Sequence, residues 1–173
     1  MSNFLIDFSK RHAKTFLTFL VQPLVRIGIH PIVLTLLALV CGLVALYFFS
    51  NKALFIFFGG IHLLFDMLDG SLARALHKTS PLGTFLDSLS DRLIEGLLLI
   101  LAPVTTALTF FAFGLFFIQL ILFFFTKTMF YARTLLFLFF VFGLFTPGVV
   151  VALLFYSVGI IFQLFYLVRR RNI

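Results

Sequence analysis

Charged side chains are scarce in this chain of 173 residues. Asp, Glu, Lys and Arg together make up 11% of the sequence, whereas hydrophobic residues make up 62% and the mean hydropathy is +1.21. Soluble domains carry about 25% charged residues, so this composition excludes that class and predicts an integral membrane protein. A chain of this length has room for about six spans of roughly 20 residues and none for a separate soluble domain.

Cysteine is nearly absent as well. The single Cys41 lies in an apolar run, which excludes a disulfide framework and favours an inert thiol over a nucleophile. We also expect no secretory signal, because Asp7 and the basic residues at positions 10, 11 and 14 interrupt the beginning of the sequence.

Breaks in the apolar sequence predict an all-α fold with six membrane spans. Most of the breaks are proline, asparagine or glycine, and one is marked by charge alone. They are Pro31, Asn51, Pro81, Pro103, the pair Lys127 and Arg133, and Pro147-Gly148. The predicted spans are 31–50, 53–77, 82–102, 106–129, 131–146 and 148–168, of which the fifth is short. Residues 3–20 show helical amphipathic spacing and predict a helix lying in the membrane interface.

The distribution of basic residues predicts the orientation of this single membrane domain, 1–173, whose six-helix bundle covers 31–168. If the amino terminus is cytoplasmic, every Lys and Arg except Lys52 falls at a cytoplasmic end. The positive-inside rule therefore places both termini in the cytoplasm. The net charge of +7 is explained by this topology and by attraction to anionic lipids. We expect no nucleic-acid partner, because the chain lacks the exposed surface for one.

Acidic residues number only six, and all except Asp7 lie within one window. The window reads D-x-x-D-G-x-x-A-R, then eight residues, then G-x-x-x-D-x-x-x-D, and Glu95 follows one turn later. An ionised carboxylate at the centre of a membrane helix costs about 2.5–3.5 kcal/mol, so the cluster needs a partner. Only Arg74, Lys78 and Arg92 are basic in this stretch. A divalent metal is therefore the simplest partner.

Helical spacing predicts that these carboxylates converge. Asp66 and Asp69 are three residues apart and share a face of the second span. Asp87 and Asp91 are four apart and form a stripe on the third span. The short connection at 77–81 makes the two spans antiparallel neighbours, which brings the four carboxylates to a similar depth. Their four negative charges would be balanced by two divalent cations.

Each part of this window has a plainer interpretation when taken alone. Two aspartates on a membrane helix are also typical of a proton or ion path, and a glycine in a span often serves only helix packing. Arg74 is equally consistent with a marker of the cytoplasmic helix end. A small ion-coupled transporter thus remains the alternative of another class, although it explains neither the Gly-Ala-Arg pattern nor the cytoplasmic position.

The complete set resembles a known signature. Its members are Asp66, Asp69, Gly70, Ala73, Arg74, Gly83, Asp87 and Asp91. With every spacing kept, they resemble the signature of the CDP-alcohol phosphotransferases, and the predicted six spans extend the resemblance along the chain. In that family an acceptor hydroxyl displaces CMP from a CDP-linked lipid or alcohol. The resemblance implies an enzyme of phospholipid biosynthesis in the cytoplasmic membrane, with its active site on the cytoplasmic side, and we expect a homodimer.

The resemblance also implies roles for individual residues. Two Mg²⁺ or Mn²⁺ ions would be held by Asp66, Asp69 and Asp87, with Asp91 as the general base that also contacts a metal. The CDP-lipid would be bound by Asp66, Asp69, Gly70, Ala73, Arg74, Gly83 and Thr35. The chain departs from the family at Ile32, where Asn commonly follows the proline. We interpret the Thr35 hydroxyl as bonded to its own helix backbone.

Two short features concern the acceptor. The stretch from Leu86 to Gly96 resembles the branch that transfers lipid phosphate to inositol phosphate, as does the Tyr131-Ala132-Arg133 triplet. We therefore expect inositol phosphate as the acceptor, with its phosphate bound by Arg133, Lys127 and Arg92. Glycerol 3-phosphate is the alternative, although its users tend to carry Lys at the position of Arg92. Uncharged alcohols come third, because they need less positive charge.

Overall fold

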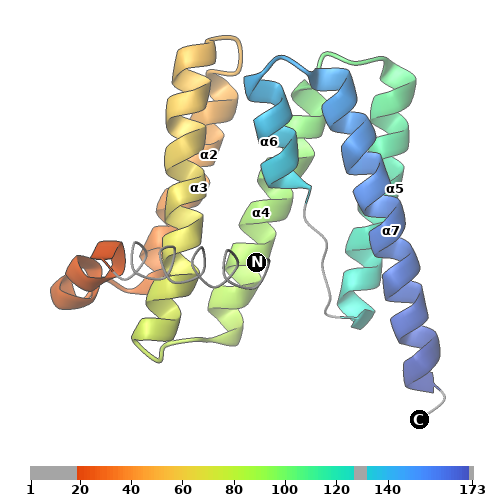
Figure 1. The fold of residues 1–173 in the computed structure, drawn as a ribbon. Helices are drawn as coiled ribbons and strands as arrows, with labels where there is room; N and C mark the ends of the chain where they lie inside the picture. Colours follow the sequence, from red (N-terminus) through yellow and green to blue (C-terminus); the bar gives the residue numbers. More distant parts are fainter. Residues whose placement is uncertain (1–18, 127–131, 172–173) are drawn as a thin grey trace, which may run out of the picture.

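The computed structural model describes residues 19–126 and 132–171, and these form helices and connecting loops without any strand (Figure 1). After a helical segment at Phe19–Ile27, the elements are α2 (Pro31–Tyr47), α3 (Lys52–Ala75), α4 (Pro81–Leu101), α5 (Thr106–Thr126), α6 (Arg133–Val141) and α7 (Phe145–Arg171). The predicted all-α fold is confirmed for these residues. The predicted interfacial helix at 3–20 lies almost wholly outside the described residues.

Local chemistry explains where the first helices begin. Pro31 and Pro81 occupy the first turn of α2 and α4, where a missing backbone N–H costs nothing. The side chains of Asn51 and Ser80 accept hydrogen bonds from Leu54 N (3.3 Å) and Gly83 N (3.0 Å), which caps α3 and α4. These are the boundaries that the breaks in the sequence predicted, to within about one residue.

The fifth predicted span, 131–146, is corrected by the structure. Helix α6 has nine residues, Arg133–Val141, and at 1.5 Å per residue it is about 14 Å long, half of what a straight span needs. The chain breaks at Gly143, which adopts φ +73°, and not at Pro147-Gly148. Helix α7 begins at Phe145, so that Pro147 lies in its first turn, where proline is tolerated.

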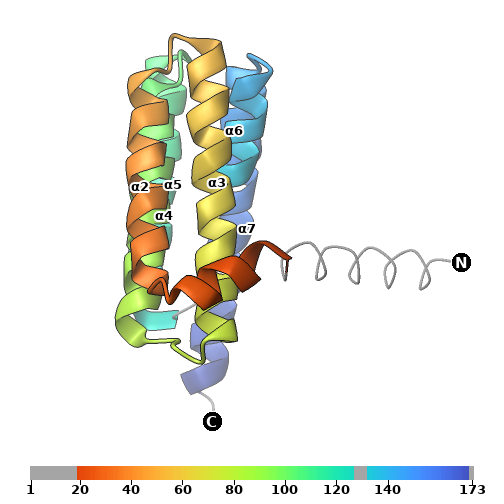
Figure 2. The ribbon, with the colours of Figure 1, turned by 90° about the vertical axis from the view of Figure 1, so that its left-hand side faces the viewer.

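Three described helices are long and apolar enough to cross a membrane, namely Lys52–Ala75, Thr106–Phe123 and Phe145–Arg169. A fourth candidate is the pair Phe19–Ile27 and Pro31–Tyr47, which is bent by 116°. Figure 2 shows the segment Phe19–Ile27 running across the end of the bundle. The acidic and basic residues of α4 explain why it does not qualify by hydropathy. The regular structure of the described residues is thus all helical and consistent with a membrane protein, and the number of six spans stays a prediction.

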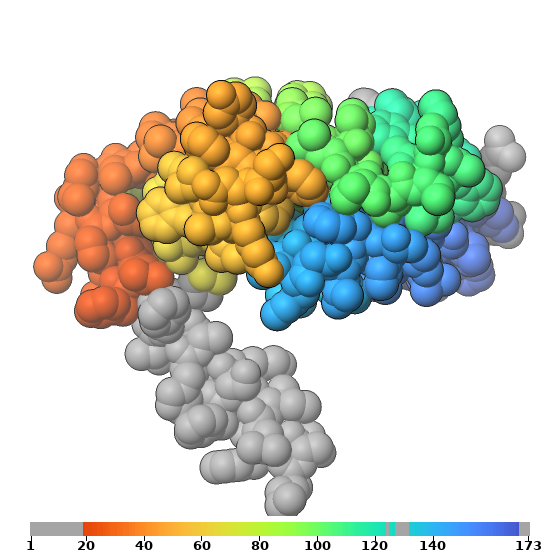
Figure 3. All heavy atoms as spheres, turned by 90° about the horizontal axis from the view of Figure 1, so that it is seen from above, coloured from red at the N-terminus to blue at the C-terminus, as the bar shows by residue number. Residues whose placement is uncertain are grey.

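The helices pack as two pairs with a middle layer. Helix α2 packs along α3, α5 packs along α7, and α4 and α6 lie between the pairs (Figures 1 and 3). A large apolar cluster contains buried residues of every helix from α2 to α7, and a smaller one joins Val21 of the first segment to Leu34, Leu68 and Leu72. The smaller cluster supports the end of α3 that carries Asp66 and Asp69.

Candidate active site

Three of the predicted acidic residues lie together between α3 and α4. One carboxylate oxygen from each of Asp66, Asp87 and Asp91 lies within 4.8 Å of the others. Asp91 is buried, and the other two are half-buried. Three carboxylates at this spacing are a donor set that suits a hard divalent cation such as Mg²⁺ or Mn²⁺. The convergence predicted from helical spacing is therefore present in the structure.

Asp69 lies beside this three-carboxylate group and is held by α2. The Thr35 hydroxyl donates a hydrogen bond of 2.6 Å to Asp69 Oδ2, whereas the backbone oxygen of Pro31 is 3.4 Å away. The hydroxyl is thus shared between two acceptors, and its contact with the carboxylate is the shorter one. The predicted contact of Thr35 with its own helix backbone is therefore present, and the shorter hydrogen bond, which sequence reasoning did not predict, orients Asp69.

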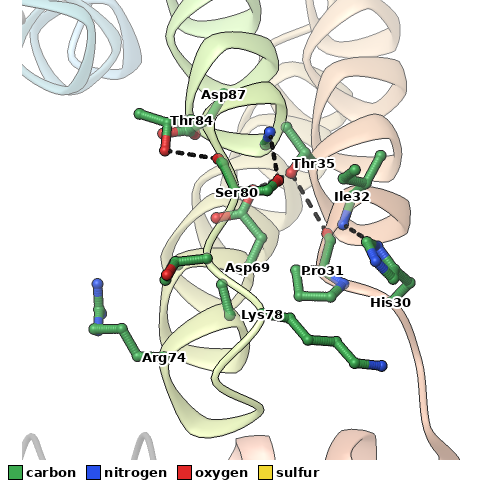
Figure 4. A pocket seen from close by; sticks show the side chains of 14 residues that line it. His30, Pro31, Ile32, Thr35, Asp69, Arg74, Lys78, Ser80, Thr84 and Asp87 are labelled. Carbon is green, nitrogen blue, oxygen red and sulfur yellow. Dashed lines mark hydrogen bonds between the residues drawn. The ribbon is translucent and has the colours of Figure 1, made fainter.

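A pocket of about 200 Å³ opens next to Asp69 and Asp87, between the beginning of α2, the end of α3 and the beginning of α4. Its walls include every residue predicted for the CDP-lipid except Asp66, namely Thr35, Asp69, Gly70, Ala73, Arg74 and Gly83. Residues that the sequence analysis did not assign also line it, among them His30, Lys78, Ser80 and Thr84. Figure 4 shows Arg74 and Lys78 below Asp69 and Asp87, on opposite sides of the view, so cationic and anionic residues both line the pocket.

The two glycines of the signature have no side chain, so the backbone itself forms part of the pocket wall at these positions. At Gly83 a Cβ would lie 3.1 Å from the Ser80 hydroxyl that caps α4, which is tighter than most real contacts. At Gly70 a Cβ would lie 3.5 Å from Arg74 Nη1, so the guanidinium lies over the glycine. Arg74 Nη2 also donates to the Ser71 hydroxyl at 3.3 Å. Arg74 is thereby held at the wall of the pocket.

Arg133, the first residue of α6, lies closer to the aspartates than predicted. Its Nη2 is 2.6 Å from Asp66 Oδ2, and its Nη1 donates to Asp91. The side chain is only 5% exposed, so Arg133 is buried and does not lie at the open cytoplasmic turn. Arg133 is 42 residues from Asp91 in sequence, so the basic residues near the acidic window do not include this partner. Lys127 lies outside the described residues.

Arg92 belongs to a second polar cluster. Its Nη1 donates to Glu95 Oε2 at 2.9 Å and to Gln119 Oε1 at 3.3 Å, and its guanidinium lies 5.6 Å from the centre of the Phe116 ring. Arg92 and Glu95 thus form a buried ion pair within α4. Gln119 and Phe116 both belong to α5, and Arg92 does not line the pocket. Its position therefore gives no support to the predicted contact with the acceptor phosphate.

Glu95 forms the centre of that second cluster. Its Oε1 accepts hydrogen bonds from Tyr156 OH on α7 (2.8 Å) and from the backbone N–H of Ala132 (2.9 Å). The carboxylate is fully buried, and a buried carboxylate needs donors of this kind. Because Ala132 immediately precedes Arg133, Glu95 also fixes the point where α6 begins.

His62 was not identified by the sequence analysis. It lies one turn before Asp66 on α3, and its Nε2 is 3.2 Å from Arg133 Nη1. Its Nδ1 is 2.8 Å from the carbonyl oxygen of Ala38 on α2. The available signal was a titratable residue four positions from Asp66, which places both on one helix face.

Comparison with known proteins gives one family match and two curated relatives. The profile of the CDP-alcohol phosphatidyltransferase family matches residues 28–170. Over 97 residues the chain is 35% identical to a phosphatidylinositol phosphate synthase of Streptomyces avermitilis, covering 50% of this chain and 38% of that protein. Over 87 residues it is 40% identical to an archaetidylinositol phosphate synthase of Pyrococcus horikoshii, covering 45% of this chain and 46% of that protein.

The matched stretches thus span less than half of either curated relative. No solved structure matches the chain significantly. The profile match covers most of the sequence and includes both helices that carry the acidic signature. The chain therefore belongs to the CDP-alcohol phosphatidyltransferase family.

Proposed function

We propose that this protein transfers a lipid phosphoryl group from a CDP-linked lipid to an alcohol, with release of CMP. The observation that carries the proposal is the position of the pocket, which opens beside Asp69 and Asp87 and is lined by nearly all the residues assigned to the donor. A diphosphate in this pocket would lie next to the three-carboxylate group. The lipid tails can remain in the bilayer while the diphosphate enters the polar space.

In this proposal Asp66, Asp69, Asp87 and Asp91 would hold two Mg²⁺ or Mn²⁺ ions. Bound there, the ions would stabilise negative charge on the diphosphate and on departing CMP. Thr35 keeps Asp69 in orientation through the 2.6 Å hydrogen bond. Gly70, Ala73 and Gly83 allow the donor to approach the helix backbones, and Arg74 offers a forked donor to a phosphate oxygen.

Asp91 is the proposed general base. It would take the proton of the acceptor hydroxyl, whose oxygen then attacks the lipid-linked phosphorus of the donor. The new P–O bond forms as the bond between that phosphorus and the CMP oxygen breaks, and CMP leaves as an anion. Asp91 is buried and in contact with Arg133, so an acceptor bound by Arg133 would have its hydroxyl within reach of the base.

We propose inositol phosphate as the acceptor and glycerol 3-phosphate as the alternative. Both curated relatives are named as inositol phosphate synthases, of the phosphatidyl and the archaetidyl type. Arg133 can give two parallel hydrogen bonds to a phosphate. Lys127 keeps its proposed role in this site, whereas Arg92 is removed from it. The transporter alternative is not carried forward, because the chain belongs to a transferase family.

The proposal includes a membrane arrangement. Six spans, with both termini and the active site in the cytoplasm, follow from the positive-inside distribution of basic residues, and we propose that the protein forms a homodimer. The short α6 would then extend only partway across the bilayer, ending near Gly143. Its buried first residue, Arg133, would lie at the depth of the aspartates and not at the membrane surface.

The test is CMP release from CDP-diacylglycerol, and in parallel from CDP-archaeol, by purified protein in detergent. We expect release to require Mg²⁺ or Mn²⁺, to stop with excess chelator, and to be stimulated by inositol phosphate. Asp87→Asn should abolish release while the thermal unfolding profile stays native-like. Stimulation by glycerol 3-phosphate instead would select the alternative acceptor. Undiminished release in excess chelator would contradict the metal-dependent reaction.

A further inference from the structure

We propose that His62 is a positioning residue, which holds the Arg133 guanidinium in the site that receives the acceptor phosphate. The inference rests on the proposed function of Arg133 as a ligand of that phosphate. His62 is not among the signature residues of the family described above. It reaches Arg133 from α3, whereas Arg133 begins α6, so the contact joins two elements far apart in sequence.

The hydrogen bonds of His62 specify one form of its ring. Ala38 O can only accept a hydrogen bond, so Nδ1, at 2.8 Å, must carry a proton. Arg133 Nη1 can only donate, so Nε2, at 3.2 Å, must be the unprotonated acceptor. The neutral ring with its proton on Nδ1 satisfies both neighbours at once. The Ala38 contact on α2 therefore orients the ring toward Arg133.

Packing leaves the imidazole little freedom to turn away. The residue is 2% exposed, and its ring occupies space that Gly42 of α2 leaves open. A Cβ at Gly42 would lie 3.1 Å from His62 Nδ1 and 2.8 Å from Ile94 Cδ1 of α4. His62 thus lies where α2, α3 and α4 meet and presents a fixed acceptor to Arg133.

Asp66 and Asp91, the other partners of Arg133, would bind metal or accept a proton during the proposed reaction. Asp66 and Asp91 now accept hydrogen bonds from the guanidinium. A carboxylate oxygen that ligates a cation, or takes up the acceptor proton, is no longer free to accept from Arg133. The His62 contact depends on none of these oxygens. It can therefore keep Arg133 in the site when its carboxylate partners are engaged.

Two substitutions separate the two sides of the ring. In His62→Asn the amide nitrogen can replace Nδ1 at Ala38, but no atom reaches Arg133. In His62→Gln the longer side chain places an amide atom near the position of Nε2. We expect His62→Asn to raise the KM for inositol phosphate roughly tenfold, the lower end for losing a hydrogen bond to a charged group. The KM for CDP-lipid should hardly change, and His62→Gln should restore part of the loss.

Binding without turnover provides a second readout. Calorimetric titration with inositol phosphate, in the absence of CDP-lipid, should show a parallel loss of affinity in His62→Asn. Val149→Ala is the matched control, because Val149 is a fully buried apolar residue near the beginning of α7, at the end of the bundle away from the aspartates. It should lower thermal stability and leave the acceptor KM unchanged. An equal effect of both variants on that KM would make His62 a packing residue and overturn the proposal.

Comparison with Arg133→Ala distinguishes this inference from the proposed function. A raised acceptor KM in Arg133→Ala with an unchanged KM in His62→Asn would overturn the role of His62 alone. An unchanged KM in both would overturn the phosphate site itself. If His62→Asn does not fold, the acceptor KM of His62→Gln is measured both in the wild-type protein and in the Arg133→Ala variant. The same effect in both backgrounds would then contradict a role that acts through Arg133.

Discussion

Each buried acidic side chain among the described residues accepts a hydrogen bond from a residue far away in sequence. Asp69 on α3 is bound by Thr35 of α2, and Glu95 on α4 is bound by Tyr156 of α7. Such donors offset the cost of burying a carboxylate and also fix its direction. The same contacts that stabilise the bundle thereby orient the groups assigned to metal binding.

A single substitution tests whether Asp91 is the general base. Asparagine keeps the size of the side chain but cannot accept the proton, so Asp91→Asn should lower turnover by roughly 10²–10⁴-fold. The affinity for CDP-lipid should change much less, as measured by equilibrium binding of the donor. A loss of donor binding as large as the loss of rate would instead identify Asp91 as chiefly a metal ligand.

Arg133 and a divalent cation require the same carboxylate oxygens. In the structure the guanidinium occupies Asp66 and Asp91, two of the three carboxylates that can hold an ion. Arg133→Ala removes both the competitor and its positive charge, so Mn²⁺ affinity should increase by roughly tenfold, or about 1.4 kcal/mol. Titration followed by Mn²⁺ paramagnetic resonance measures it directly. Lys52→Ala, which removes a distant positive charge at the other end of α3, is the control.

A different outcome in that titration has a definite meaning. If Arg133→Ala binds Mn²⁺ with wild-type affinity or more weakly, Arg133 and the ion do not compete for Asp66 and Asp91. The guanidinium would then have to be placed beside the ion and not in its position.

Helix α6 depends on a close approach to α3. A Cβ at Gly59 would lie 1.9 Å from Cε2 of Phe137, far inside any real contact. Phe137 lies one turn after Arg133, so this glycine allows the beginning of α6 to approach the face of α3 that carries Asp66. The position of Arg133 relative to Asp66 therefore depends on the packing of Phe137 against Gly59.

Gly59→Ala should therefore affect both stability and activity. The added methyl forces Phe137 to move, and overpacking of this kind costs about 1–3 kcal/mol. We expect a lower thermal unfolding temperature in detergent and a higher acceptor KM. The double variant Gly59→Ala with Phe137→Leu should recover both, because the smaller side chain makes room. Failure of the double variant to recover either property would contradict the assigned contact.

For the whole molecule, the distribution of charge predicts which end faces the cytoplasm. The loops before and after α3 lie at opposite ends of the bundle (Figure 1). With Cys41 replaced by alanine, single cysteines can be placed at the exposed positions Ser50 and Thr79. An impermeant maleimide added to intact cells should label Ser50→Cys and should label Thr79→Cys only after permeabilisation. The reverse pattern would place the active site on the outer face.

Much of this architecture was predictable because local rules determine it. The helix boundaries at Pro31, Asn51 and Pro81 follow from proline geometry and side-chain capping, both of which act within one turn. The grouping of Asp66, Asp87 and Asp91 follows from the helical period and one short connection. The break before α7 was misplaced because Pro147 is compatible with a first helical turn, while Gly143 supplied the actual turn.

The sequence by itself determined the membrane class, the boundaries of α2 to α4 and the acidic signature, because hydropathy, capping and helical period need no knowledge of distant contacts. Tertiary structure alone decided the partners of those acids: Arg133 for Asp66 and Asp91, and His62 for Arg133. These contacts join residues 42 to 71 positions apart. They depend on how far α6 can approach α3 and where Glu95 fixes its beginning. That distance is set by packing between helices, which no local pattern encodes.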